Sequence, residues 1–109
     1  MKIIAVHQPL QGVALRMGRN MDLYKLRMEI DRVDTELLPL LLRRMDLVHR
    51  VGILKELNGL PVRDVSRETE VLEKVCDPSP PEYKEHVKEI YEKILEVSRK
   101  QQTDLMGED

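Results

Sequence analysis

The chain has 109 residues, enough for one domain, and a formal net charge of −2. This charge offers no general attraction for nucleic acid or anionic membranes, and no apolar run approaches the length that spans a membrane. Charged residues make up 35% of the chain and aromatic residues 3%, with no Trp and no Phe, so the core must be aliphatic. The single cysteine, Cys76, excludes an internal disulfide and indicates a reducing, cytoplasmic setting.

Residues 1–20 differ from the rest of the chain. They carry basic residues and no acidic one, and several Pro and Gly residues interrupt them. Their apolar segment, residues 3–6, is too short for a signal peptide and has no partner strand, so we expect a poorly ordered N-terminal extension. We expect a helical domain at residues 21–104 and a frayed tail at residues 105–109.

The segment from about Asp22 to Leu57 has the pattern of one long helix. Its apolar residues recur at alternating steps of three and four, which is typical of a helix that packs against other helices. At about 1.5 Å per residue the helix would be roughly 50 Å long, whereas a domain of this size has a radius of gyration of about 13 Å. The apolar seam therefore needs a second copy of the chain, and we expect an intertwined homodimer. The seam consists of Leu23, Leu26, Ile30, Val33, Leu37, Leu40, Leu47, Val51 and Leu54.

Two residues interrupt the pattern of this segment. Between Leu40 and Leu47 the seam position falls on Arg44, where a guanidinium is costly unless an anion meets it. The anion could be a Glu of a neighbouring helix, which is the commoner arrangement, or a bound ligand. Pro39 removes a backbone hydrogen bond, at a typical cost of about 3 kcal/mol in a helix interior. The segment therefore either kinks or divides into two helices, and the unbroken seam on both sides favours a kink.

Local signals mark the ends of the first two helices. Asn20 is a candidate N-cap of the first helix, with Asp22 in its first turn. Residues 58–61, Asn-Gly-Leu-Pro, end that helix, because Gly and Pro commonly follow a last helical turn. A short second helix is expected from about Asp64, its N-cap, to Cys76.

A Pro-rich turn leads into the third helix. Ser79 as N-cap, Pro80 at the first helical position and Glu82 three residues after the cap would form a capping box. The third helix is expected to run to about Thr103. The whole pattern predicts an all-α fold with three helices per chain, one long, one short and one of medium length.

Five polar residues of the long and the third helix are candidates for a site. Arg44 and Lys55 are about 20° from the same helix face and about 16 Å apart along the axis, so they can line one pocket. Arg27 lies about 25 Å from Arg44 and roughly 100° round the helix, so in an antiparallel dimer it could enter the pocket of the partner. Ser98 and Gln102, at i and i+4, are either the polar edge of the third helix's apolar stripe or site residues.

The start of the second helix combines charged side chains with free backbone N–H groups. Residues 63–68, Arg-Asp-Val-Ser-Arg-Glu, place guanidiniums and carboxylates within about one turn. Such a run is either a surface salt-bridge cluster of little energetic weight or a lip over an anion site at a helix N-terminus.

These residues form an ordered set of motifs. They are Leu26-Arg27-x-x-Ile30-x-x-x-Asp34, Leu41-Leu42-x-Arg44, Val51-Gly52-x-x-Lys55, Pro61-Val62-Arg63-Asp64-x-x-Arg67-Glu68 and Ser98-x-x-x-Gln102. In this order and at this spacing the set resembles the all-helical class of chorismate mutases. The resemblance covers residues 22–103, and Pro39 departs from the pattern.

The resemblance implies three helices per chain in an intertwined dimer with two shared sites. It implies the Claisen rearrangement of chorismate to prephenate, toward phenylalanine and tyrosine, with no cofactor and no metal. By the same likeness, Arg44 and Arg27 of the partner subunit would clamp the two substrate carboxylates, and Arg67 and Ser98 would assist them.

The remaining motif residues would act on the other end of the substrate. By resemblance, Lys55 and Gln102 would point at the ether oxygen, where negative charge grows as the bond breaks. Glu68 and the backbone of Asp64 would hold the ring hydroxyl. Because Gln102 is neutral, we expect little pH dependence of the rate near neutrality.

Other functions have weaker support in the sequence. An isochorismate pyruvate lyase of the same fold is suggested by residues 44–46, Arg-Met-Asp, whereas residues 63–68 favour a mutase. A non-catalytic helical module that binds a shikimate-pathway partner is a further alternative. The chain has no basic stripe with stacking aromatic residues, as nucleic-acid binding would require, and His7, His49 and His86 lack the spacing of metal ligands.

Overall fold

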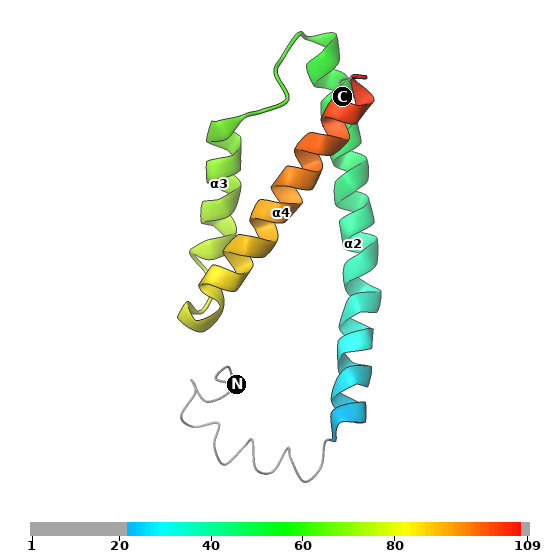
Figure 1. The fold of residues 1–109 in the computed structure, drawn as a ribbon, viewed down its shortest axis with the longest axis vertical. Helices are drawn as coiled ribbons and strands as arrows, with labels where there is room; N and C mark the ends of the chain where they lie inside the picture. The colour runs from blue at the N-terminus through cyan, green and yellow to red at the C-terminus, as the bar shows by residue number, and fades with distance from the viewer. Residues whose placement is uncertain (1–21, 108–109) are drawn as a thin grey trace. The chain divides into compact units, whose positions relative to one another are not determined.

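Three helices make up the part of the chain that the structure describes. The computed structural model describes residues 22–107, which contain α2 (Leu23–Leu57), α3 (Val65–Cys76), α4 (Pro81–Leu105) and no strand (Figure 1). The predicted all-α fold with one long, one short and one medium helix is confirmed. The predicted N-terminal extension, residues 1–20, lies outside the described residues.

The chain divides into two units, and the boundary between them follows Leu41. The second unit includes the C-terminal part of α2 together with α3 and α4. The contacts between helices that are described below lie within this second unit.

The helix α2 begins directly after Asp22. The Asp22 carboxylate accepts a hydrogen bond from the Lys25 backbone N–H at 2.9 Å, so Asp22 caps the helix. The prediction that Asp22 lies in the first helical turn is therefore wrong. The predicted cap, Asn20, lies outside the described residues. Pro39 lies inside α2, so the alternative of two separate helices is wrong, whereas the kink stays a prediction.

The C-terminus of α2 is a Schellman motif built on Gly59. The φ of Gly59 is +66°, a left-handed conformation that glycine adopts without steric cost. The Leu60 N–H donates to the Lys55 carbonyl at 2.8 Å, and the Gly59 N–H donates to the Glu56 carbonyl at 3.3 Å. The helix end predicted at residues 58–61 is therefore confirmed, and Lys55 is placed in the last turn.

The two remaining helix starts differ in how well they were predicted. Asp64 is the N-cap of α3, as predicted, and its side chain accepts a hydrogen bond from the backbone N–H three residues later at 3.0 Å. The predicted capping box at Ser79 is wrong. The helix α4 begins at Pro81 without a side-chain cap, and the Ser79 hydroxyl instead donates to the Val75 carbonyl at 2.6 Å. Ser79 therefore stabilises the end of α3.

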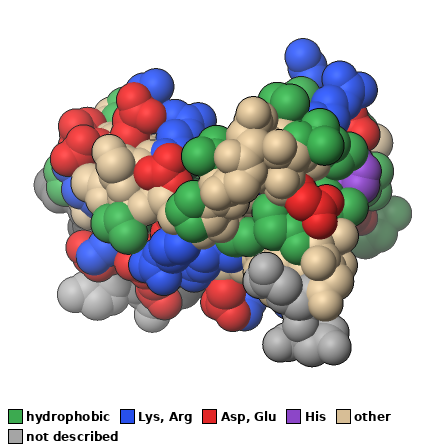
Figure 2. Space-filling model, turned by 90° about the horizontal axis from the view of Figure 1, so that it is seen from above, with side chains coloured by type: hydrophobic (Ala, Val, Ile, Leu, Met, Phe, Trp, Pro, Cys, Tyr) green, Lys and Arg blue, Asp and Glu red, His purple; other side chains and the backbone are tan. Residues whose placement is uncertain are grey.

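Residues 22–107 bury few hydrophobic side chains. Helices α3 and α4 contact each other, and Leu95 of α4, 7% exposed, is the only buried hydrophobic side chain among residues 22–107. By contrast, Leu23, Val33 and Leu40 of the α2 seam are each 60% exposed. Hydrophobic side chains also lie among charged ones on the face drawn in Figure 2. Within the described residues, these positions on the apolar side of α2 are thus exposed.

Gly52 allows α2 and α4 to approach closely. It is buried, and a Cβ atom added to it would lie 3.0 Å from Leu105 Cδ2 and 3.2 Å from Gln102 Cγ. These distances are shorter than ordinary van der Waals contact, so a side chain at residue 52 would require Leu105 and Gln102 to shift.

We expect Gly52→Val to lower the free energy of unfolding by about 1–3 kcal/mol, because overpacking forces the two helices apart. Urea unfolding followed by circular dichroism measures this change. His49→Val is the control, since it introduces the same β-branched side chain at an exposed position of the same helix. Equal unfolding curves for the two variants would contradict the close approach at Gly52.

Candidate active site

A cavity of about 270 Å³ lies in the second unit between α2, the loop after it, α3 and α4. Its volume is near the lower end of the range for small-molecule sites, about 300–1,000 Å³. The apolar lining consists of Leu47, Val48, Val51, Val62, Val71 and Leu95. The polar lining consists of Arg44, Lys55, Asp64, Arg67, Glu68, Ser98, Arg99 and Gln102. The cavity thus brings together every predicted site residue except Arg27, and adds Arg99.

Arg44 is held in place by a neutral partner. Its Nη1 donates to Ser98 Oγ at 2.7 Å, and the Ser98 hydroxyl in turn donates to the Ile94 carbonyl at 2.9 Å. Within residues 22–107 no carboxylate lies within ion-pair distance of Arg44, so the alternative of a Glu from a neighbouring helix is not observed. A half-buried guanidinium that is oriented but not neutralised suits an anionic ligand.

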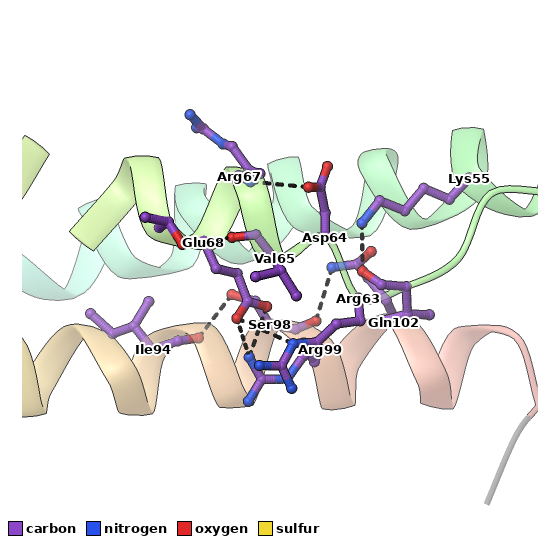
Figure 3. A network of polar contacts seen from close by, with 12 residues as sticks. Lys55, Arg63, Asp64, Val65, Arg67, Glu68, Ile94, Ser98, Arg99 and Gln102 are labelled. Carbon is purple, nitrogen blue, oxygen red and sulfur yellow. Dashed lines mark hydrogen bonds and ion pairs between the residues drawn. The ribbon is translucent and has the colours of Figure 1, made fainter. Parts of the chain in front are cut away.

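Lys55 is fixed by the loop that follows α2. Its Nζ donates to the Val62 carbonyl at 2.7 Å. Figure 3 marks a bond of the Lys55 ammonium with a dashed line. An ammonium group has three donors, so this bond leaves others for a ligand. No carboxylate of the described chain forms an ion pair with Lys55. The cavity therefore contains a second cationic group that is not neutralised.

Gln102 is the most deeply buried polar residue of the cavity, at 6% exposed. Its Nε2 donates to the Ser98 carbonyl at 3.2 Å, and its Oε1 has no hydrogen-bond partner within the described chain. Buried polar atoms are nearly always paired, so an unpaired one at a cavity wall points to a missing partner. The amide also keeps one N–H that is not used by Ser98.

The side chains of Arg67 and Asp64 each form a hydrogen bond to another group of α3. The Arg67 guanidinium donates to Glu70 at 2.6 Å, and the side chain is 59% exposed. This hydrogen bond, together with the charge of Lys74, lowers the pKa of the Glu70 carboxyl. In Figure 3 the guanidinium of Arg67 points away from the Glu68–Arg99 pair, and the Asp64 carboxylate is used as the cap of α3. Arg67 would have to leave Glu70 to assist Arg44.

Glu68 is paired with a residue that the sequence did not single out. Nη1 of Arg99 lies 2.7 Å from each Glu68 oxygen, and Nε of Arg63 lies 3.6 Å from Oε1 (Figure 3). Arg99 directly follows Ser98, and its charge next to a site residue is the only signal that the sequence offers for it. Arg99 therefore joins the site through its contact with Glu68.

The remaining predictions concern Arg27 and metal binding. Arg27 lies on the N-terminal part of α2 with an exposed side chain, and its predicted entry into the site of a second copy stays a prediction. Residues 22–107 contain no group of three or more His, Cys, Asp or Glu side chains placed to hold a metal ion. In the same stretch, none of the helices combines the length and apolar character needed to cross a membrane.

An all-helical unit whose cavity holds Arg44 and Lys55 without a carboxylate partner among the described residues has the features of a site for a small organic anion. The particular family follows from comparison with known sequences. The chain belongs to the chorismate mutase type II family, whose sequence model matches residues 26–103. This match spans all the motifs that suggested the resemblance.

One curated relative supports the same family. The chain is 44% identical over 54 residues to a bifunctional chorismate mutase/prephenate dehydratase of Aquifex aeolicus. The aligned part is 50% of this chain but 15% of that protein, so only a small part of the relative is comparable. No solved structure matches the chain significantly.

Proposed function

We propose that this chain is a chorismate mutase, an isomerase that converts chorismate to prephenate in phenylalanine and tyrosine biosynthesis. The observation that carries the proposal is the cavity lined by Arg44 and Lys55, neither of which forms an ion pair with a carboxylate of the described residues. Chorismate is a compact dianion with an apolar ring system, and its charge and size suit these walls. Family membership and the name of the Aquifex relative support the same activity.

The rearrangement is unimolecular, and it needs no proton transfer, covalent intermediate, cofactor or metal. The protein has two tasks, which are to hold the reactive compact conformer and to stabilise the charge that grows on the ether oxygen. Arg44, oriented by Ser98, binds a substrate carboxylate. The ammonium of Lys55 and the free N–H of Gln102 stabilise the ether oxygen. Electrostatic stabilisation and conformational restraint thus supply the catalysis.

Four further groups complete the site. Glu68 accepts a hydrogen bond from the ring hydroxyl, and the backbone of Asp64 assists it. Arg67 exchanges its exposed Glu70 partner for a substrate carboxylate, at small cost because exposed ion pairs contribute little. Arg27 of the partner subunit binds the second carboxylate. The resemblance to the family supports these roles.

The site requires an intertwined homodimer in this proposal. The exposed seam of α2 supports a second copy, since exposed Leu and Val side chains gain about 25 cal/mol for each Å² of apolar area removed from water. We expect analytical ultracentrifugation to show a dimer at micromolar concentration. A folded monomer at that concentration would rule out the shared site.

The mutase domain would comprise residues 21–104, and the single cysteine fits a cytoplasmic location. The Aquifex relative carries the name of a chorismate mutase joined to a prephenate dehydratase. That name supports the proposal that this chain associates with another shikimate-pathway enzyme.

The proposal is tested by incubating the purified chain with chorismate and, separately, with isochorismate, and identifying the products by NMR. We expect prephenate from chorismate as the dominant reaction. Salicylate and pyruvate from isochorismate as the dominant products would make the protein a lyase of the same fold. Turnover of neither compound would favour a non-catalytic module that binds a pathway partner.

A further inference from the structure

Glu68 and Arg99 form an ion pair unlike the others in the described chain. Their side chains are 16% and 28% exposed, whereas every other ion pair within residues 22–107 has at least one side chain more than half exposed. The pair also joins two helices, because Glu68 belongs to α3 and Arg99 to α4. It is therefore the charged contact that is best protected from solvent screening.

The pair lies at the wall of the cavity. Both Glu68 and Arg99 line it, together with Arg44, Lys55 and Gln102. Two adjacent residues of α4 thus each hold a charged group of another helix. Ser98 accepts a hydrogen bond from Arg44 of α2, and Arg99 donates to Glu68 of α3.

We propose that Arg99 is a positioning residue, whose guanidinium holds the Glu68 carboxylate in the orientation that accepts the hydrogen bond of the substrate's ring hydroxyl. This inference rests on the proposed function. A carboxylate has about four acceptor sites, so Glu68 can accept from Arg99 with both oxygens and still accept from a hydroxyl group. Arg99 itself touches no reacting atom in this proposal.

Arg63 cannot take over this task. It approaches only one oxygen of Glu68, at 3.6 Å, and its side chain is 61% exposed. An exposed ion pair at this distance fixes neither partner, because water competes for both. Without Arg99, the Glu68 carboxylate would be free to turn toward Arg63 and away from the ring hydroxyl.

The first test compares Arg99→Met, Arg99→Lys and the control Arg63→Met in steady-state kinetics with chorismate. The hydroxyl contact is present in substrate and transition state alike, so its loss should act mainly on KM. We expect Arg99→Met to raise KM about tenfold with a much smaller change in kcat. Arg99→Lys should recover part of this loss, and Arg63→Met should change KM less than about twofold.

Thermal unfolding of the same variants separates positioning from simple stabilisation of the fold. A purely structural tie between α3 and α4 would lower the Tm of Arg99→Met and leave the KM of the folded enzyme unchanged. That result would overturn the proposal.

A double-mutant cycle shows whether Arg99 acts through Glu68. If it does, Glu68→Gln combined with Arg99→Met should be no worse than Glu68→Gln alone. Effects that multiply would mean that Arg99 acts independently, and would also overturn the proposal. An analogue of chorismate with hydrogen in place of the ring hydroxyl should be bound equally well by wild type and Arg99→Met.

These outcomes are distinguishable from failure of the proposed function. A wild-type protein that does not convert chorismate would refute the function and the positioning role together. A wild-type protein that converts chorismate, with Arg99→Met unchanged in KM, would refute the positioning role alone.

Discussion

Arg44→Ala should lower kcat/KM for chorismate by about a thousandfold, the largest effect of any single substitution in this cavity. Removing one member of a desolvated charge pair typically costs about 2–5 kcal/mol, and about 4 kcal/mol corresponds to this factor. The guanidinium of Arg44 is already oriented by Ser98 at 2.7 Å, so binding of a carboxylate needs little reorganisation. Steady-state kinetics measured by the loss of chorismate absorbance give the value.

Two companion variants show what Arg44 contributes. Arg44→Lys keeps the charge but loses the planar, two-pronged geometry, so it should recover only a small part of the activity. Arg43→Ala is a matched control, because Arg43 is the neighbouring residue of α2, is exposed and does not line the cavity. A loss of kcat/KM of less than about tenfold in Arg44→Ala would contradict a role of Arg44 in binding the substrate carboxylate.

Gln102→Glu should convert a rate that is nearly independent of pH into one that rises as the pH falls. Near pH 7.5 an ionised carboxylate at this position would repel the developing negative charge on the ether oxygen. We expect a loss on the order of a hundredfold or more, as for removal of one donor from an oxyanion site. Below the pKa of the introduced carboxyl its O–H becomes a donor, so activity should return toward that of the wild type.

The position of Gln102 makes this effect specific. Gln102 is 6% exposed, and burial favours the neutral form of a carboxyl group, so the recovery should begin at mildly acid pH. Gln101→Glu is the control, because Gln101 is the neighbouring residue of α4 and does not line the cavity. It should keep the flat profile of the wild type. A flat profile for Gln102→Glu as well would contradict a role at the ether oxygen.

The helices could be predicted from the sequence because their signals are local. The three-and-four spacing of α2, the left-handed Gly59 at its end and the Asp64 cap of α3 each depend on neighbouring residues alone. The Ser79 capping box failed because two consecutive prolines follow this residue. Either proline could begin a helix, and the Ser79 hydroxyl found a closer acceptor in the preceding turn of α3.

The candidate site was predictable only in part. Arg44 stood out because it interrupts an apolar seam, but the roles of the other residues came from the resemblance to a family. The contact of Arg99 with Glu68 depends on the register of α4 against α3, which no local pattern encodes. The pair of Arg67 with Glu70 could have been predicted, because their spacing of three residues on one helix favours such a bond.

Mixing two inactive variants tests most directly whether this family member builds each site from two chains. Arg27→Ala and Arg44→Ala should each have little activity alone. In a shared-site dimer, a mixed dimer carries one site with both substitutions and one intact site. Unfolding the two variants together and refolding them in equal amounts should therefore restore about a quarter of the wild-type chorismate mutase activity, since about half of the dimers are mixed. A refolded mixture no more active than its two components would contradict a site shared between subunits.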